Sequence, residues 1–175
     1  MSEAFSNFPT GSYEDALKWI GYTHPRRAGE LPVEKSAVQL LAGMVEDANP
    51  SYWDEDWAIN TWGAVVAPPA QLQTWVIPLP WKPEGADTHI ALASQVPLPG
   101  RSLINVTTDV TYERHARVGE TVYVEERVTA VSPAQSSRVG TGHFVTTQAT
   151  YSGADGDVIA IYANTLFRFD PDGEA

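Results

Sequence analysis

The residues best suited to chemistry lie between residues 42 and 54, where an apolar helical pattern stops at a cluster of carboxylates. Asp47 and Asn49 come just before Pro50, and a proline ends a helix and turns the residue before it away from helical geometry. Carboxylates at a helix C-terminus oppose the helix macrodipole, and Glu46 with Asp47 does this twice. A local rule broken in this way points to function. The alternative interpretation is a solvated helix exit followed by an Asn-Pro turn.

Helical patterns surround this stop. A serine followed three residues later by an aspartate resembles a capping box and predicts a short amphipathic helix over residues 12–20. A second helix is predicted from Ser36 to the acidic stop, and its apolar stripe must pack on something. Beyond the stop, the pattern continues as a short helix or turn from Trp53 toward Gly63.

A further helix is predicted after Pro68 and Pro69, because proline fits the first helical turn. Pro78 and Pro80 prevent its continuation, so it has about two turns where a central core helix usually has three or more. The Pro-containing segment 78–101 that follows is too long for a simple connector, which makes it a candidate lid, ligand rim or interface.

From residue 105 onward the pattern changes to strand, turn and strand. Strands are predicted over residues 106–114, 121–131, 138–151 and 158–169. The turns between them, the first at Gly119, predict an antiparallel meander. In the last strand apolar residues alternate with Tyr162, Asn164 and Arg168, so we expect one face to meet a core and the other to meet water or a partner sheet. Helices followed by a curled antiparallel sheet indicate an α+β fold.

Aromatic side chains concentrate between residues 53 and 81, which hold five of the six tryptophans. Core packing is the usual cause of such density, but a broad apolar slot for a bulky ligand would use the same residues. The tryptophans assigned to this slot are Trp57, Trp62, Trp75 and Trp81, with the loop through Pro97 as its roof.

Composition limits the possible partners. A chain of 175 residues suits one domain over residues 1–175. Its net charge of −11 disfavours nucleic acid and anionic membranes, so a phosphate-bearing ligand would need a local basic patch. The adjacent pair Arg26 and Arg27, in a segment predicted as a loop from residue 23 to 32, is that patch or a solvated loop. With no cysteine, no leader pattern and no apolar run near the ~20 residues that cross a bilayer, we expect a cytoplasmic protein.

Several kinds of chemistry find no support. The sequence contains no Walker loop, no Rossmann glycine pattern, no Gly-x-Ser-x-Gly elbow and no metal-spaced set of histidines, so no metal site is predicted. The four histidines, at positions 24, 89, 115 and 143, stand apart. His143 shares its strand face with Val145 and Ala149, which favours a satisfied core histidine over a catalytic base.

A resemblance to the MaoC-like dehydratases rests on residues 46–52, Glu-Asp-Ala-Asn-Pro-Ser-Tyr, followed by Gly63, then Ala67-Pro68-Pro69 and a long antiparallel sheet. It is strongest to the fatty-acid-synthase-type N-terminal dehydratase branch. It covers residues 33–170 and implies a hot-dog fold with a shortened central helix, preceded by an N-terminal helix and loop over residues 1–32. The wider family contains (R)-specific enoyl-CoA hydratases, in which a Gly-Asp-x-Asn-Pro-x-His motif supplies an Asp and a His that activate a water. No cofactor is implied, because coenzyme A is part of the substrate.

The chain departs from that motif at two positions. Asp47 and Asn49 match it, but Glu46 replaces the glycine and Tyr52 stands where the histidine is expected. A phenol has an unperturbed pKa near 10 and exchanges protons poorly around neutrality, so the acid–base pair is incomplete.

A second departure concerns the thioester carbonyl. The hydratases polarise it with a backbone N–H at the start of the central helix, where Pro68 and Pro69 have none to offer. Losing one such donor costs about 10²–10³ in rate. The two departures together indicate a half-site that no longer performs chemistry.

The resemblance therefore implies the substrate-accommodating subunit of a heteromeric (R)-specific enoyl-CoA hydratase, paired with a MaoC-like subunit that carries the Asp and the His. The shortened helix would leave room for a bulky acyl group, for which a steroid side-chain thioester is one candidate. Two alternatives stay open: a self-sufficient homodimeric hydratase in which Asp47 works with His89 or His143, and a non-catalytic acyl-CoA-binding protein.

Overall fold

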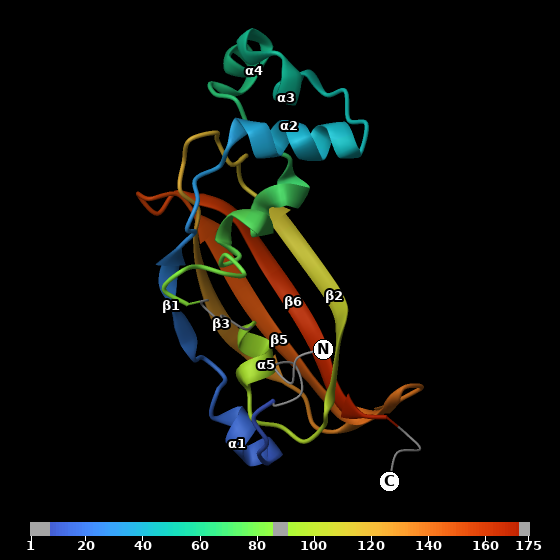
Figure 1. The fold of residues 1–175 in the computed structure, drawn as a ribbon. Helices are drawn as coiled ribbons and strands as arrows, with labels where there is room; N and C mark the ends of the chain where they lie inside the picture. The colour runs from blue at the N-terminus through green and yellow to red at the C-terminus, as the bar shows by residue number, and fades with distance from the viewer. Residues whose placement is uncertain (1–7, 86–90, 172–175) are drawn as a thin grey trace.

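A six-stranded antiparallel sheet forms the framework of the chain, of which the computed structural model describes residues 8–85 and 91–171 (Figure 1). The spatial order is β1-β3-β5-β6-β2, so the sheet is open, with edges at β1 and β2, and β4 pairs only with β5. In chain order the strands are β1 (Thr23–Ala28), β2 (Ser102–Tyr112), β3 (Tyr123–Val131), β4 (Gln135–Ser137), β5 (Gly140–Ser152) and β6 (Val158–Asp170).

Short helices accompany the sheet. Those of the described residues are α1 (Tyr13–Leu17), α2 (Lys35–Met44), α3 (Pro50–Trp53), α4 (Glu55–Trp62), the 3-10 helix η2 (Pro69–Val76) and α5 (Leu92–Gln95). Figure 1 shows α2, α3 and α4 beyond one end of the sheet and α1 at the other end. None of these helices is long and apolar enough to cross a membrane.

Local capping residues set the helix ends. The predicted capping box is confirmed at α1, where Ser12 and Asp15 satisfy each other's backbone N–H, although the helix ends at Leu17 and not at residue 20. The Asp54 side chain accepts from the backbone N–H of Trp57 and begins α4. Gly63 ends that helix in the left-handed region, at φ 76°, as a residue without Cβ does most readily.

Helix α2 buries only part of its apolar surface. Val38 and Ala42 are fully buried in the core, as expected for the stripe that faces the sheet. Leu40, Met44 and Val45 are instead largely exposed. The apolar stripe was expected to pack on something, and within the single chain these three residues have no such cover.

The segment predicted as a basic loop contains an edge strand. β1 pairs antiparallel with β3, and its register shifts between His24 and Arg27. Pro25 lies within this irregularity, because proline cannot donate to a ladder and is confined to edge strands and bulges. The loop prediction gave too much weight to that proline, and Arg26 and Arg27 belong to a strand.

Strand β2 occupies an unexpected place. It pairs along its whole length with β6, the last strand, from Ser102 opposite Phe169 to Tyr112 opposite Ala160. The predicted hairpin between β2 and β3 is therefore wrong, and the meander is limited to β3, β5 and β6. After β2, Arg117 forms an isolated β-bridge with Val66. The chain then continues to β3, which lies beyond β6 and β5 in the strand order.

The core lies on the face of the sheet that carries the helices. The predicted division of β6 into a buried and a solvated face is not seen, because Tyr162 and Arg168 of the polar set are buried and so are Ile159, Phe167 and Phe169 of the apolar set. The Arg168 guanidinium donates to three backbone carbonyls, those of Pro9, Val96 and Gly100. A charged residue on this strand is thus fully buried because backbone carbonyls surround its guanidinium.

The helix that follows the two prolines is short, as predicted. Its backbone is a 3-10 helix from Pro69 to Val76, and the chain is extended at Ile77 before Pro78. Leu72, Trp75 and Val76 anchor it in the core. Because the helix stops there, the sheet beyond Val76 is not covered by a continuous helix.

Candidate functional site

The acidic stop forms the turn between α2 and α3. Glu46 has a φ of 56°, which puts a residue with a Cβ in the left-handed region. The related motif has a glycine at this position, and the backbone geometry explains that choice, because glycine enters this region without steric cost. Glu46 therefore holds a backbone conformation that a glycine would adopt without this cost.

Asp47 and Asn49 stabilise this turn. A carboxylate oxygen of Asp47 accepts the backbone N–H of Asn49 at 2.9 Å, and its carbonyl accepts the indole N–H of Trp53 at 2.7 Å. The Asn49 side chain accepts from the backbone N–H of Ser51 and caps α3, whose first residue is Pro50. The side chains of Asp47 and Asn49, the two residues that match the motif, thus accept hydrogen bonds from backbone N–H groups of their own turn.

Tyr52, at the position of the expected histidine, lies in the core. Its side chain is 6% exposed and belongs to the same apolar cluster as Val38 and Ala42. Burial raises the pKa of the phenol, and the negative charge of Asp47 raises it further. The group therefore holds its proton at neutral pH even more firmly than an exposed tyrosine would.

A cavity of about 320 Å³ opens on the sheet where η2 ends. We call it the sheet chamber; residues that line it from the helix side and from the strands include Arg27, Val76, Pro78, Thr147, Tyr151 and Tyr162. Burial and the nearby charge of Glu126 raise the pKa of Tyr151 to about 12. The sheet chamber thus combines hydroxyl groups and apolar side chains with the charged residues Arg27 and Glu126, at the point where Pro78 ends the helical segment.

A second cavity, of about 380 Å³, lies at the other end of η2. We call it the Trp62 cavity, and its lining includes Trp62, Pro68, Pro69, Leu72, Tyr112 and His115. The predicted residues Trp62, Pro68 and Pro69 therefore meet at one site. The indole of Trp62 packs edge-on against the His115 ring, with 4.6 Å between centroids.

Two tyrosines stand between the two cavities. Tyr112 lines the Trp62 cavity and Tyr162 lines the sheet chamber, and their hydroxyl oxygens are 2.9 Å apart. The Tyr112 hydroxyl also donates to the carbonyl of Pro69 at 3.2 Å, so Tyr162 donates to Tyr112. Burial and the hydrogen bond with Tyr112 raise the pKa of Tyr162, so this phenol keeps its proton at neutral pH.

The two arginines have structural partners. The Arg26 guanidinium donates to the Gly153 carbonyl and lies 4.0 Å from the centroid of the Tyr123 ring. Arg27 donates to the carbonyl of Val76 at 2.5 Å and lines the sheet chamber. Of the predicted basic pair, Arg27 lies at a cavity and Arg26 fastens the strand to the turn after β5.

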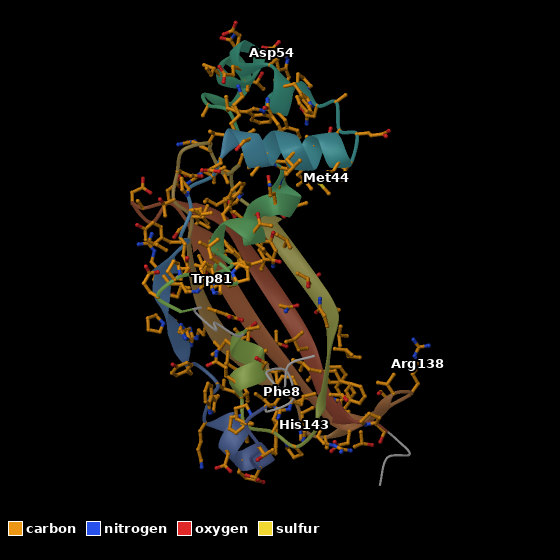
Figure 2. The ribbon with its side chains drawn as sticks, in the orientation of Figure 1. Phe8, Met44, Asp54, Trp81, Arg138 and His143 are labelled. Carbon is orange, nitrogen blue, oxygen red and sulfur yellow. The ribbon has the colours of Figure 1, made fainter. Side chains whose placement is uncertain are left out.

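The remaining tryptophans do not share one slot. Trp75 is buried and lines a different cavity, of about 270 Å³, together with Glu30 and Leu31. Trp57 is partly exposed on α4, and Trp81 is 72% exposed (Figure 2). Pro97, assigned to the roof, instead lies against Gly11. Trp62 is the member of the predicted set that lines the larger of the two cavities at η2.

Of the two histidines proposed as distant partners of Asp47, His143 does not reach it (Figure 2). His143 is buried, with Nδ1 2.9 Å from the Ser132 carbonyl and its ring stacked on Tyr13. Figure 2 shows it at the opposite end of the sheet from the helical unit that carries Asp54. His89 lies outside the described residues. The satisfied core histidine predicted at position 143 is confirmed.

Sequence reasoning missed His115. It follows β2 in the segment that crosses to β3, and burial lowers its pKa. No local spacing links it to Trp62, which lies 53 positions earlier in the chain. The sequence has only four histidines, so each one could have been considered as a candidate site residue.

Comparison with known proteins identifies the chain's relatives. The family model described as "FAS1-like, dehydratase domain region" matches residues 18–162. A protein of Thermomonospora curvata named "Probable enoyl-CoA hydratase alpha subunit" is 33% identical over 172 residues, which are 91% of this chain and 52% of that protein. The chain thus spans about half the length of this curated relative.

Solved structures share the fold. The ChsH1-ChsH2 complex from Mycobacterium tuberculosis contains a chain that matches with a TM-score of 0.76 at 19% identity, covering 92% of this chain and 97% of that one. A MaoC-like dehydratase from Rhodospirillum rubrum matches with a TM-score of 0.60 at 21% identity, covering 86% and 92%. These similarities confirm the α+β hot-dog fold predicted from the sequence.

Proposed function

Because the chain belongs to the FAS1-like dehydratase region family of MaoC-like hot-dog proteins, we propose that it is the substrate-accommodating subunit of a heteromeric (R)-specific enoyl-CoA hydratase. The observation that carries this proposal is the sheet chamber, which lies where Val76 and Pro78 end the helical segment. A helix continued past that point would cover the same part of the sheet. The chamber therefore accepts a bulky acyl group, for which a steroid side-chain thioester is one candidate.

The motif residues support a subunit that leaves the chemistry to a partner. Hydration needs a base and an acid within reach of one water. In this chain Asp47 bonds to its own turn, Tyr52 is a buried phenol whose pKa is raised, and Pro68 and Pro69 have no N–H for the thioester carbonyl. We therefore assign the Asp and His of the reaction to a MaoC-like partner subunit.

Exposed apolar side chains support the need for a partner. Leu40, Met44 and Val45 project from α2 without cover in the single chain, and such exposure is common at protein interfaces. The names of two relatives, an alpha subunit and a two-protein complex, agree with a heteromer.

The decisive experiment fills the sheet chamber. Thr147 is buried on β5 and lines the chamber, whereas the next residue, Gln148, is exposed on the other face. We would prepare Thr147→Phe and the matched control Gln148→Phe, each with the catalytic partner, and measure kcat/KM for crotonyl-CoA and for a polycyclic enoyl-CoA. Loss of fit in an apolar pocket costs on the order of tenfold or more, so Thr147→Phe should lose the bulky substrate selectively.

Three results would overturn the proposal. If the wild-type complex used both substrates with equal efficiency, or if Thr147→Phe lowered both to the same extent while remaining folded, the chamber would not select the acyl group. Robust hydration by the chain without a partner, abolished by Asp47→Ala, would instead support the self-sufficient enzyme.

A further inference from the structure

Most polar groups around the Trp62 cavity already have partners. The Tyr112 hydroxyl bonds to Pro69 and Tyr162. Arg114 is held by Glu120 and Asp157 and also donates to the His115 carbonyl. These groups are committed to the protein and have little left to offer a ligand.

The imidazole of His115 is the exception. Its Nδ1 is buried and has no hydrogen-bond partner. Burial lowers the pKa of the ring, so it is neutral at pH 7 and carries one N–H. A buried N–H without an acceptor costs about 1–3 kcal/mol, which favours the tautomer with the proton on Nε2 and only a lone pair on Nδ1. In that tautomer the N–H is on Nε2, the ring lines the cavity, and the described residues show no hydrogen bond from its side chain.

The ring is held in place by packing. The Trp62 indole packs edge-on against it, with 4.6 Å between the ring centroids. The indole N–H of Trp62 donates to the Ser51 hydroxyl at 3.0 Å, which fixes the indole in turn. The surrounding wall is apolar, because Val66, Leu72 and Ile159 are buried beside the two prolines. At the cavity margin, Glu113 and Arg117 contribute opposite charges, so the site has no single sign that would select an ion.

We propose that the Trp62 cavity binds a largely apolar ligand with a neutral carbonyl group, and that His115 donates a hydrogen bond from Nε2 to the carbonyl oxygen. The cavity is separate from the sheet chamber, from which the Tyr112–Tyr162 pair divides it. The carbonyl can belong to a free ketone or to the thioester of an acyl-CoA, and only the second source rests on the proposed function.

The test uses the full chain and two small probes of the same shape. 1-Indanone has the carbonyl, and indane lacks it. Titrations followed by the ¹⁵N signals of the histidine side chains should show a saturable shift of His115 with 1-indanone. One net hydrogen bond corresponds to about three- to tenfold in affinity, so indane should bind that much more weakly. Equal affinity for both probes, or a 1-indanone shift that spares His115, overturns the proposal.

Variants provide a second readout. His115→Phe keeps a ring against Trp62 but removes both nitrogens, so 1-indanone should bind as weakly as indane while indane binding is unchanged. His143→Phe is the matched control, because His143 is also buried but its Nδ1 lies 2.9 Å from the Ser132 carbonyl. If His115→Phe does not fold, the comparison of the two probes on the wild-type chain decides alone.

A third titration identifies the source of the carbonyl. Butyryl-CoA has a thioester but no double bond to hydrate. A His115 shift with butyryl-CoA that 1-indanone competes away assigns the site to the thioester, and a shift with 1-indanone alone assigns it to a free ketone. No shift with either overturns the site. None of these titrations needs turnover or a partner. A negative result would therefore overturn the His115 site without affecting the outcome of the Thr147→Phe experiment, which tests the proposed function.

Discussion

The indole N–H of Trp62 donates to the hydroxyl of Ser51 over 3.0 Å, and this bond ties the last residue of α4 to α3. Through Ser51 and Asn49 it also connects the Trp62 cavity to the turn that carries Asp47. The motif turn and the cavity therefore do not share a pocket, but one short series of hydrogen bonds joins them. Trp62 is the member of this series that also lines the cavity.

Trp62→Phe should lower the free energy of unfolding by more than Ser51→Ala does. Ser51→Ala removes one hydrogen bond, worth about 1 kcal/mol. Trp62→Phe removes the same bond and also reduces the contact with the His115 ring, because a phenyl ring is smaller than an indole. Urea denaturation of both variants checks the order, with Trp81→Phe as the control, because Trp81 is 72% exposed and its replacement should change stability by less than about 0.5 kcal/mol. A Trp62→Phe variant as stable as the control would contradict this account of the bond.

Glu46→Gly should stabilise the protein. The residue has a φ of 56°, where a Cβ costs roughly 1–2 kcal/mol and glycine has no such cost. Part of this gain is lost because glycine makes the unfolded chain more flexible, so we expect a net gain of about 0.5–1 kcal/mol. Glu46→Ala removes the same charge but keeps the Cβ, and it should gain much less. Thermal unfolding of the two variants separates backbone strain from charge, and equal melting temperatures would show that the strain is not stored there.

The two tyrosines between the cavities should respond unequally to loss of their hydroxyls. Tyr112→Phe leaves the buried hydroxyl of Tyr162 without its partner, which costs about 1–3 kcal/mol. Tyr162→Phe leaves the hydroxyl of Tyr112 bonded to Pro69, and Tyr112 is exposed enough to reach water, so the cost should be about 1 kcal/mol or less. Chemical denaturation of both variants measures the asymmetry. A larger loss of stability in Tyr162→Phe than in Tyr112→Phe would mean that Tyr162 does not donate to Tyr112 as described.

Stability should fall on acidification in a way that depends on His115. Burial lowers the pKa of this ring in the folded state below its ordinary value of 6.5. Below pH 6.5 the unfolded chain therefore binds a proton that the folded chain resists, and the unfolding free energy decreases until the pH falls below the folded-state pKa. His115→Phe should flatten the profile of unfolding free energy between about pH 7.5 and that lower limit. An unchanged slope in the variant would show that another group causes the loss.

Much of the architecture follows from local patterns in the sequence. Period-two alternation located β3, β5 and β6, and the serine and aspartate of the capping box located α1. Pro78 predicted the early end of the helical segment, because proline cannot continue a helix, and the order of the motif residues predicted the hot-dog fold. These features depend on neighbours a few positions apart, so a single chain read from end to end reveals them.

Contacts between distant residues depended on the tertiary structure. No local signal tells β2 to pair with β6 and not with β3, because both partners offer alternating strands and the choice depends on how the whole sheet closes over its core. The same holds for Arg168, whose charge predicts an exposed face until the carbonyls of Pro9, Val96 and Gly100 are brought around it. His115 and Trp62 meet because the segment after β2 pairs with the residues around Val66, which follow α4. The sequence by itself determined which elements form, and the tertiary structure decided which side chains face one another, because packing energy depends on residues that the chain separates by tens of positions.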